Sequence, residues 1–196
     1  MGESWVVVGL DNGGNKNNAT VVDPAGRFLV DSLVETPSRV REGPEIALRA
    51  LVEWQLEEGI DFLVPCGSTG EAQTLSTEER ELVVRTVVEA ADGRVPVMAG
   101  ASHNDTRQAV EEARRMSGLG ATWLLSATPW YNKPTPEGLT RHFTAVAEAA
   151  SVPICLYNVP SRTAVNMKPD VVLRLCEHPN IIGIKESSGD LAQVQH

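Results

Sequence analysis

The chain is poor in cysteine, and the few cysteines that it has are not arranged for cross-linking. Among its 196 residues there are only three, Cys66, Cys155 and Cys176. They are odd in number, widely spaced and form no C-x-x-C pair, so the sequence offers neither a disulfide framework nor a zinc motif. We therefore expect reduced thiols and a cytoplasmic protein.

Basic residues and long apolar runs are also scarce. Seventeen Lys and Arg stand against 26 Asp and Glu, which gives a net charge of −9. This balance argues against a nucleic-acid or anionic-membrane partner. The apolar runs fall far short of the roughly 18 residues that a membrane span needs. The first residues, "MGESWVVVGLD", carry an acidic flank and predict no secretory signal.

The pattern of the sequence changes near residue 43. Before it, short β-branched runs alternate with turns rich in Asn and Gly, which predicts strands joined by tight turns. After it, helical and strand patterns alternate. Helices are predicted over residues 44–59, 76–93, 104–120, 135–150 and 168–178, and strands over 61–67, 95–100, 121–129, 152–160 and 181–185.

The later strands are continuously apolar, which is typical of parallel strands covered on both faces. Both a doubly wound open sheet and a (β/α)₈ barrel fit this pattern. Polar groups follow all five strands, and active sites lie at the carboxyl ends of parallel strands. This distribution suits a barrel mouth better than one crevice. We therefore predict an α/β fold with a β-hairpin segment (1–47) followed by a partial TIM barrel of about five strands (48–196).

Two residues at the ends of these strands suggest covalent chemistry. Lys185 ends the apolar run "IIGIK", and a lysine pointing into a barrel would be desolvated, which lowers its pKa and frees the amine to attack a carbonyl. Tyr157, in "CLYNVPSRT", could shuttle protons beside such a Schiff base. Each also has a simpler interpretation: a lysine whose ammonium reaches water, and a tyrosine that plugs a strand end.

Three loops carry further candidates. "GSTGE" contains Ser68, Thr69 and Gly70, and is either an ordinary tight turn or a cradle for a small carboxylate. Arg162, after the rigid "VPS", is either solvated or a clamp for a second carboxylate. Tyr131, in "PWYNKP", is either a surface residue or one that reaches over the site.

Four motifs together resemble a known family. "GSTGE", "TPWYNKPTPEGL", "YNVPSRT" and "IIGIKESSGD" are similar, in order and spacing, to those of the dihydrodipicolinate synthase and N-acetylneuraminate lyase family of class I aldolases. The resemblance covers about Leu48 to His196. One small departure is Trp130, where the family often has Tyr.

The resemblance implies a role for each candidate. Lys185 would form the Schiff base with pyruvate, Tyr157 would transfer protons, and Thr69, with Gly70 beside it, would bind the pyruvate carboxylate. Ser68 would link two tyrosines through its hydroxyl, Tyr131 would reach across a subunit interface of a homo-oligomer, and Arg162 would hold the carboxylate of the aldehyde substrate. No metal or organic cofactor is implied, because the lysine itself is the electron sink.

The "PSRT" stretch favours the synthase, which condenses pyruvate with aspartate semialdehyde in lysine biosynthesis. The alternative within the family is an N-acetylneuraminate or 2-keto-3-deoxy sugar acid lyase. Both are lyases that use pyruvate, so the motifs alone fix the class of reaction more firmly than the second substrate.

The two ends of the chain depart from the family. The opening strand motif "G-x-x-x-A-x-x-T-P" is absent, and the last two strands are missing after residue 196. Residues 1 to about 50 instead resemble the first phosphate-binding hairpin of the ROK sugar kinases, with Asp11, Gly13, Gly14 and Lys16 in place and Asn15 where Thr is usual. A third possibility is therefore a kinase fragment or an inactive fusion product. We expect a partial barrel with exposed edges, marginal stability and a need for a partner chain.

Overall fold

The computed structural model describes residues 7–12, 16–22, 34–37 and 39–195. The strands are β1 (Val7–Asn12), β2 (Lys16–Val22), β3 (Val34–Pro37), β4 (Met98–Gly100), β5 (Trp123–Ala127), β6 (Ile154–Asn158) and β7 (Ile181–Glu186). The α-helices are α1 (Pro44–Glu57), α2 (Thr77–Ala91), α3 (Thr106–Ser117), α4 (Pro136–Ala149), α5 (Pro160–Thr163), α6 (Pro169–Leu175) and α7 (Leu191–Val194). Short 3₁₀ turns cover η1 (Val40–Glu42), η2 (Ser68–Gly70) and η3 (Ala72–Thr74).

The chain divides into two compact units, Met1–Trp54 and Gln55–His196. In the first unit, β1, β2 and β3 form an antiparallel sheet in that order. The register of β1 and β2 runs from Val7 opposite Val22 to Asn12 opposite Asn17. Strands predicted for the first 43 residues are therefore present, whereas the predicted turns at 13–15 and 23–33 lie outside the described residues. The predicted domain boundary at residue 47 stays a prediction.

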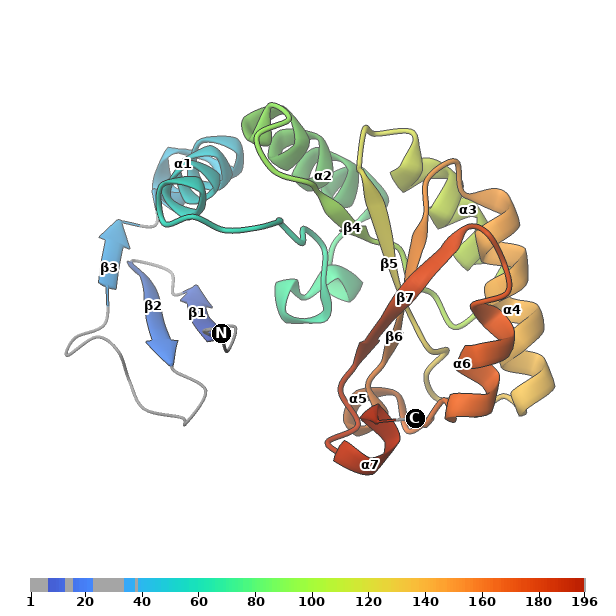
Figure 1. The fold of residues 1–196 in the computed structure, drawn as a ribbon. Coiled ribbons are helices and arrows are strands. Elements are labelled where there is room, and N and C mark those ends of the chain that lie inside the picture. The colour runs from blue at the N-terminus through green and yellow to red at the C-terminus, as the bar shows by residue number, and fades with distance from the viewer. Residues whose placement is uncertain (1–6, 13–15, 23–33, 38, 196) are drawn as a thin grey trace. The chain divides into compact units, whose positions relative to one another are not determined.

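The second unit is built on a parallel sheet with the order β4-β5-β6-β7. Helices α3, α4 and α6 lie together on one side of it (Figure 1). Adjacent residues of a strand point to opposite faces, and here they enter different clusters. Leu124 and Leu156 join the large core with Phe143 of α4, whereas Leu125 and Tyr157 pack in a smaller cluster.

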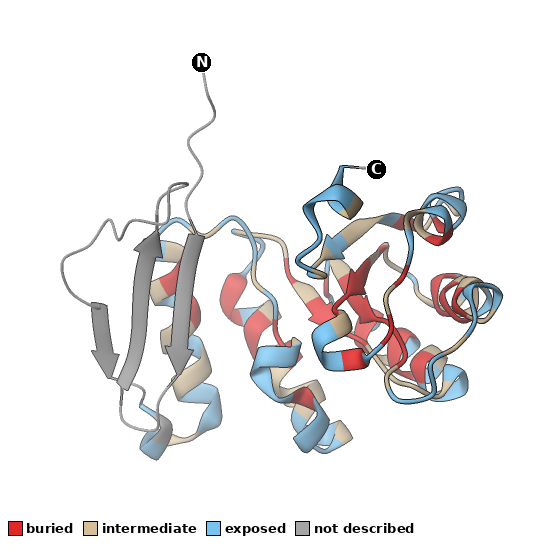
Figure 2. Ribbon diagram, turned by 90° about the horizontal axis from the view of Figure 1, so that it is seen from below, coloured by how far each residue is buried: buried red, intermediate tan, exposed pale blue. Residues whose placement is uncertain are grey.

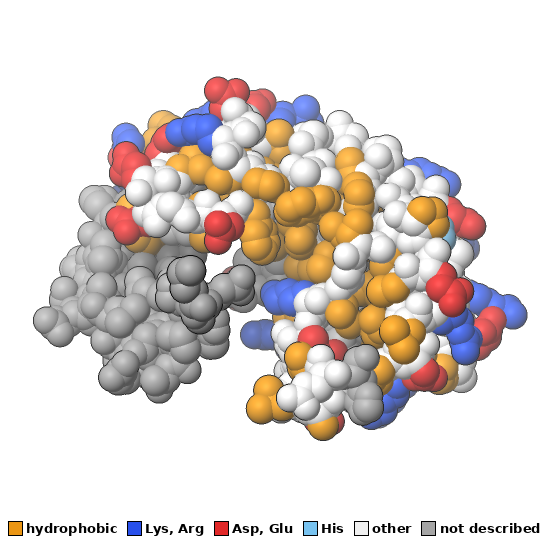
Figure 3. Space-filling view, in the orientation of Figure 1, with side chains coloured by type: hydrophobic (Ala, Val, Ile, Leu, Met, Phe, Trp, Pro, Cys, Tyr) orange, Lys and Arg blue, Asp and Glu red, His pale blue; other side chains and the backbone are white. Residues whose placement is uncertain are grey.

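The larger cluster fills the space between the sheet and the helices, where most residues are buried (Figure 2). The opposite face carries apolar side chains that remain visible over the sheet (Figure 3). In the part of the chain that the structure describes, helices cover one face of the sheet, and Leu125, Ala127 and Tyr157 are buried on the other, so β5 and β6 are covered on both faces as predicted. The α/β class and the partial barrel are confirmed, since a barrel strand has helices outside and other strands' side chains inside.

The prediction of a short buried strand over residues 61–67 is wrong. Only one isolated bridge forms, between Leu63 and Val97. Phe62 and Val64 are 42% and 41% exposed. The segment bonds to β4 on one side only, and the positive φ of 57° at Cys66 turns the chain out of the extended conformation.

Helix starts follow the predicted capping chemistry. The Ser76 amide donates to the Glu79 carboxylate at 2.7 Å, and the Glu79 amide donates back to the Ser76 hydroxyl at 3.2 Å. This reciprocal pair satisfies two donors that a helix N-terminus leaves free. Asp105 and Thr135 cap α3 and α4 with their side-chain oxygens.

Among the described residues, we find no helix with the length and apolar character needed to cross a membrane.

Candidate active site

The carboxyl ends of β6 and β7 bring the two principal candidates together. The parallel register pairs Tyr157 with Lys185, so both side chains project from the same face of the sheet. The Lys185 Nζ atom lies 4.2 Å from the centroid of the Tyr157 ring. A cation at this distance from an aromatic face is attracted by the ring quadrupole. The predicted proximity of amine and phenol is present.

The expected burial of Lys185 is wrong in this structure. Tyr157 is only 7% exposed, but Lys185 is exposed. The reason is its strand: β7 stands at the edge of the four-stranded sheet, so among the described residues no strand beyond it covers the amine.

A cavity of about 350 Å³ opens beside Tyr157. Of the residues proposed from the sequence, Ser68, Tyr157 and Arg162 line it. Its walls come from η2, from the ends of β4 to β6 and from α5. The cavity thus lies where the carboxyl ends of parallel strands converge, which is the usual place for a site in this architecture.

The "GSTGE" loop forms the 3₁₀ turn η2 and leaves Ser68, Thr69 and Gly70 exposed. Thr69 and Gly70 do not line the cavity. The Gly70 amide donates to the Gly67 carbonyl at 3.0 Å, and the Glu71 amide donates to the Ser68 carbonyl at 3.2 Å. Because these two amides close the turn, they are not free for a carboxylate. The predicted cradle of inward-pointing amides is therefore incomplete, although the hydroxyls remain open.

Arg162 is held by a buried turn. It is exposed on α5, and its amide donates to the Val159 carbonyl at 2.9 Å. The next residue, Thr163, is 4% exposed; its hydroxyl accepts from Thr128 of the loop after β5 at 3.0 Å. The turn is therefore fixed to the neighbouring strand end while the guanidinium remains free at the cavity rim. Sequence reasoning missed both threonines, because a hydroxyl pair across 35 residues leaves no local pattern.

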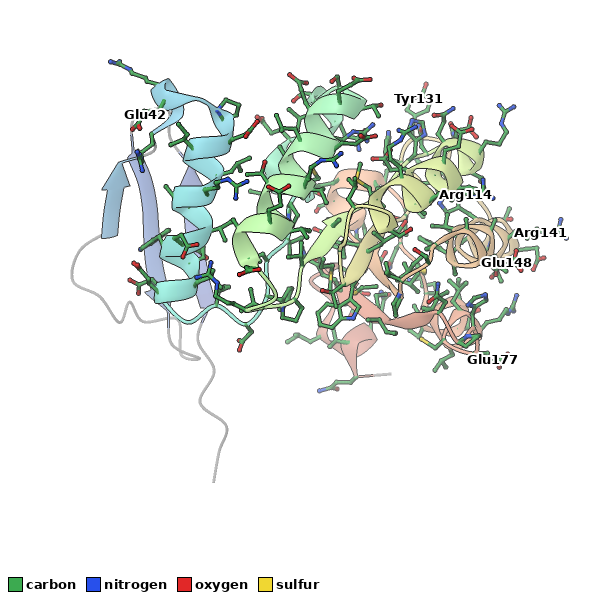
Figure 4. All side chains as sticks on the ribbon, turned by 90° about the horizontal axis from the view of Figure 1, so that it is seen from above. Glu42, Arg114, Tyr131, Arg141, Glu148 and Glu177 are labelled. Carbon is green, nitrogen blue, oxygen red and sulfur yellow. The ribbon has the colours of Figure 1, made fainter. Side chains whose placement is uncertain are left out.

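Tyr131 does not join this group. It is 85% exposed and projects outward from the ribbon (Figure 4). Tyr131 and Lys133 both have positive φ, 71° and 47°. Such values are unusual for residues with a Cβ, and Tyr131 is absent from the cavity lining although the preceding Trp130 belongs to it.

Burial raises the pKa of two thiols near the site. Desolvation raises the pKa of the Cys66 thiol to about 11, since Cys66 lies under the cavity and is 8% exposed. Burial also raises the pKa of the half-buried Cys155, against the opposing effect of Lys185. Neither thiol is therefore prepared to act as a nucleophile.

The phosphate-binding residues proposed in the first unit cannot be placed as a site. Gly13 and Gly14 lie outside the described residues. Asp11 falls on β1 and Lys16 on β2, with backbone positions only.

Comparison with known proteins agrees with the motifs of the second unit. The sequence profile of the Dihydrodipicolinate synthetase family matches residues 41–196. The 4-hydroxy-tetrahydrodipicolinate synthase of Acidobacterium capsulatum is 54% identical over 162 residues, covering 81% of this chain and 54% of that protein. The corresponding enzyme of Koribacter versatilis is 54% identical over 149 residues, or 76% of this chain and 50% of that protein.

The same likeness holds among solved structures. The chloride-inhibited dihydrodipicolinate synthase of Acinetobacter baumannii, complexed with pyruvate, superposes with a TM-score of 0.75 at 46% identity, covering 76% of this chain and 52% of that one. The chain thus spans about half the length of the relatives it matches. On the profile match and these identities, the chain belongs to the dihydrodipicolinate synthetase family.

Proposed function

We propose that this chain carries the pyruvate-activating part of a 4-hydroxy-tetrahydrodipicolinate synthase, a Schiff-base lyase that condenses pyruvate with aspartate semialdehyde. The observation that carries the proposal is the position of the Lys185 amine, 4.2 Å from the ring centroid of Tyr157, a residue that lines the cavity at the strand ends. The names of the relatives and the pyruvate bound in the A. baumannii structure support it.

The first half of the reaction uses Lys185 and Tyr157. The unprotonated amine of Lys185 attacks the C2 carbonyl of pyruvate, and the alkoxide takes up a proton to give a carbinolamine. Loss of the hydroxyl as water leaves an iminium, and removal of a C3 proton gives the enamine. Tyr157, whose ring centroid lies 4.2 Å from the amine, is the group that we propose supplies and accepts these protons.

The second half adds the aldehyde. The enamine carbon attacks the carbonyl carbon of aspartate semialdehyde, so that a C–C bond forms, the iminium is regenerated and the aldehyde oxygen takes up a proton to become a hydroxyl. Attack of the substrate's own amino group on the iminium carbon would then expel the Lys185 amine and close the ring. Arg162 at the cavity rim would hold the carboxylate of this substrate through a charge-assisted pair. Thr69 would bind the pyruvate carboxylate, with Ser68 relaying protons from the cavity wall.

Lys185 is exposed in the single chain, and we infer that further covering is needed for full activity. A homo-oligomer in the cytoplasm, with the exposed Tyr131 at a contact between subunits, is the arrangement that we propose. Condensation therefore demands more of the protein than imine formation, which needs only the amine, the phenol and pyruvate.

The sugar acid lyases of the same family differ in the second substrate, and Arg162 favours the synthase over them. The ROK-like hairpin of residues 11–16 stays a prediction, since the family profile begins at residue 41. ATP binding would test it through a shift in melting temperature. An inactive fusion product would instead show neither imine formation nor an ATP effect.

The direct test is trapping. Pyruvate with sodium borohydride should reduce the imine to a stable secondary amine, so that one carboxyethyl group is found on Lys185 by peptide mass spectrometry. Supply of aspartate semialdehyde before the borohydride should consume the enamine and lower the yield of the adduct, whereas N-acetylmannosamine should not.

A further inference from the structure

One residue beyond the Tyr157–Lys185 pair, β6 and β7 are joined by a second pair of side chains. The register aligns Asn158 with Glu186. The Asn158 Nδ2 atom donates to both carboxylate oxygens of Glu186, at 3.1 Å and 2.9 Å. Because successive residues alternate between faces, this pair lies on the face of the sheet opposite to the cavity.

Asn158 is anchored from several directions. It is 0% exposed, and its Oδ1 atom accepts from the Met167 amide at 2.9 Å. Its amide nitrogen also donates to Asn166 Oδ1 at 2.8 Å, and its backbone carbonyl accepts from the Ser187 amide at 2.8 Å. Such a buried, fully bonded side chain has a single position.

Glu186 is anchored in the same way on the neighbouring strand. Its carboxylate accepts from the Ser188 amide at 2.6 Å and from Gln193 Nε2 at 3.1 Å, in addition to Asn158. Desolvation raises the pKa of Glu186, but these hydrogen bonds outweigh it, and the pKa lies below the ordinary value. The carboxylate is therefore an anion at neutral pH.

The backbone pairing of β6 with β7 does not by itself fix the register of the two strands. The register shifts between Ile154 and Cys155, at the amino end of β6. β7 is also an edge strand among the described residues. A slip of one residue would carry Lys185 to the helix-covered face, because side chains alternate. The backbone hydrogen bonds between β6 and β7 are thus irregular at one end, and β7 is held by a neighbouring strand on one side only among the described residues.

We propose that Asn158 and Glu186 are positioning residues, whose contact fixes the register that places Lys185 against Tyr157. The catalytic role of Lys185, and therefore the importance of its position, rests on the function proposed above. They act from the far face and touch no substrate.

The first readout needs no catalysis. The chain has four lysines, Lys16, Lys133, Lys168 and Lys185, so reductive ¹³C-methylation should give few NMR signals. The methyls of Lys185 should be shifted upfield by the Tyr157 ring, and Lys185→Arg assigns the signal by removing it. Tyr157→Leu should abolish the upfield shift.

The variants exchange the charge between the strands. Asn158→Asp sets two carboxylates against each other and should move the Lys185 signal to the position of an exposed lysine. Asn158→Asp combined with Glu186→Gln restores an amide–carboxylate pair and should restore the upfield shift. Glu137→Gln is the matched control, because Glu137 of α4 forms exposed ion pairs with Arg141 of α4 and Arg174 of α6.

The second readout is pyruvate trapping at Lys185 in the same proteins. We expect the yield to fall roughly tenfold in Asn158→Asp, as displacement of a reacting group does, and to recover in the double variant. An unchanged signal or yield in Asn158→Asp overturns the proposal. So does a double variant that stays unfolded or folds without the upfield signal. A wild-type chain with the upfield signal but no adduct would overturn the proposed function and leave the positioning role supported.

Discussion

The carbonyl oxygen of Cys66 lies against the Cα atom of Gly100, so that a Cβ built on Gly100 would overlap it. This approach is where the segment after α1 bonds to β4, since the Gly100 amide donates to the Pro65 carbonyl at 2.9 Å. Both residues line the cavity. The width of the cavity at this wall therefore depends on the absence of a side chain at position 100.

Gly100→Ala should destabilise the second unit by about 1–3 kcal/mol, the usual cost of forcing a methyl group into a filled space. Urea unfolding followed by circular dichroism measures it. Gly183→Ala is the matched control, because a Cβ at Gly183, also on a strand, would meet nothing within 4 Å. Equal midpoints for the two variants would contradict the close approach.

The helix-start prediction concerns the capping box of α2. Ser76→Ala removes the acceptor for the Glu79 amide and should cost about 1 kcal/mol. Ser151→Ala, at an exposed serine outside any helix, should change the midpoint little. If Ser76→Ala unfolds at the wild-type midpoint, the cap contributes nothing to stability.

His142 should make stability depend on pH. It is 3% exposed on α4, and desolvation lowers its pKa to about 4; the Asp105 carboxylate opposes this shift, and His103 adds slightly to it. Below pH 6.5 the His142 imidazole becomes protonated in the unfolded chain but stays neutral in the folded chain. Stability therefore falls as the pH falls from about 6.5, and it levels off below about pH 4. The full effect is at most about 3 kcal/mol.

His142→Asn should flatten this part of the stability curve. Asparagine can still bond to the Thr106 hydroxyl, which lies 2.9 Å from His142 Nδ1. When the free energy of unfolding of the variant is subtracted from that of the wild type, the pH dependence due to the carboxylates that both proteins contain cancels. A difference that does not change between pH 4 and 6.5 would show that His142 titrates normally.

Replacing Arg162 should affect the use of aspartate semialdehyde but not that of pyruvate. Arg162→Ala removes a guanidinium that the described contacts hold only by its backbone. Pyruvate trapping should stay within about twofold of the wild type, because the role proposed for Arg162 is in the second half of the reaction. The loss of adduct caused by aspartate semialdehyde should disappear. A large fall in pyruvate trapping itself would place Arg162 at the first substrate.

The sequence predicted the parts of this structure that have local or periodic causes. Helix α2 begins at its capping box, and the parallel strands appear where apolar runs alternate with helices. The proximity of Tyr157 and Lys185 followed from the convergence of strand ends. These features depend on residues near each other in the chain, or on general rules of topology.

What the sequence did not predict depends on neighbours distant in the chain. The exposure of Lys185 reflects the edge position of β7, and the failure of residues 61–67 to form a strand reflects pairing on one side only. The Asn158–Glu186 contact joins residues 28 positions apart, and neither side chain follows a pattern that distinguishes it from an ordinary polar residue. Such contacts are visible only once the register is known.

The most direct test of the account is the site of the pyruvate adduct. Wild-type protein, Lys185→Arg and Lys133→Arg are each treated with pyruvate and borohydride and then mapped by peptide mass spectrometry. We predict a carboxyethyl group on Lys185 in the wild type and in Lys133→Arg, and none in Lys185→Arg. Adduct spread evenly over the lysines, or retained in Lys185→Arg, would contradict the claim that Lys185 is the reactive amine.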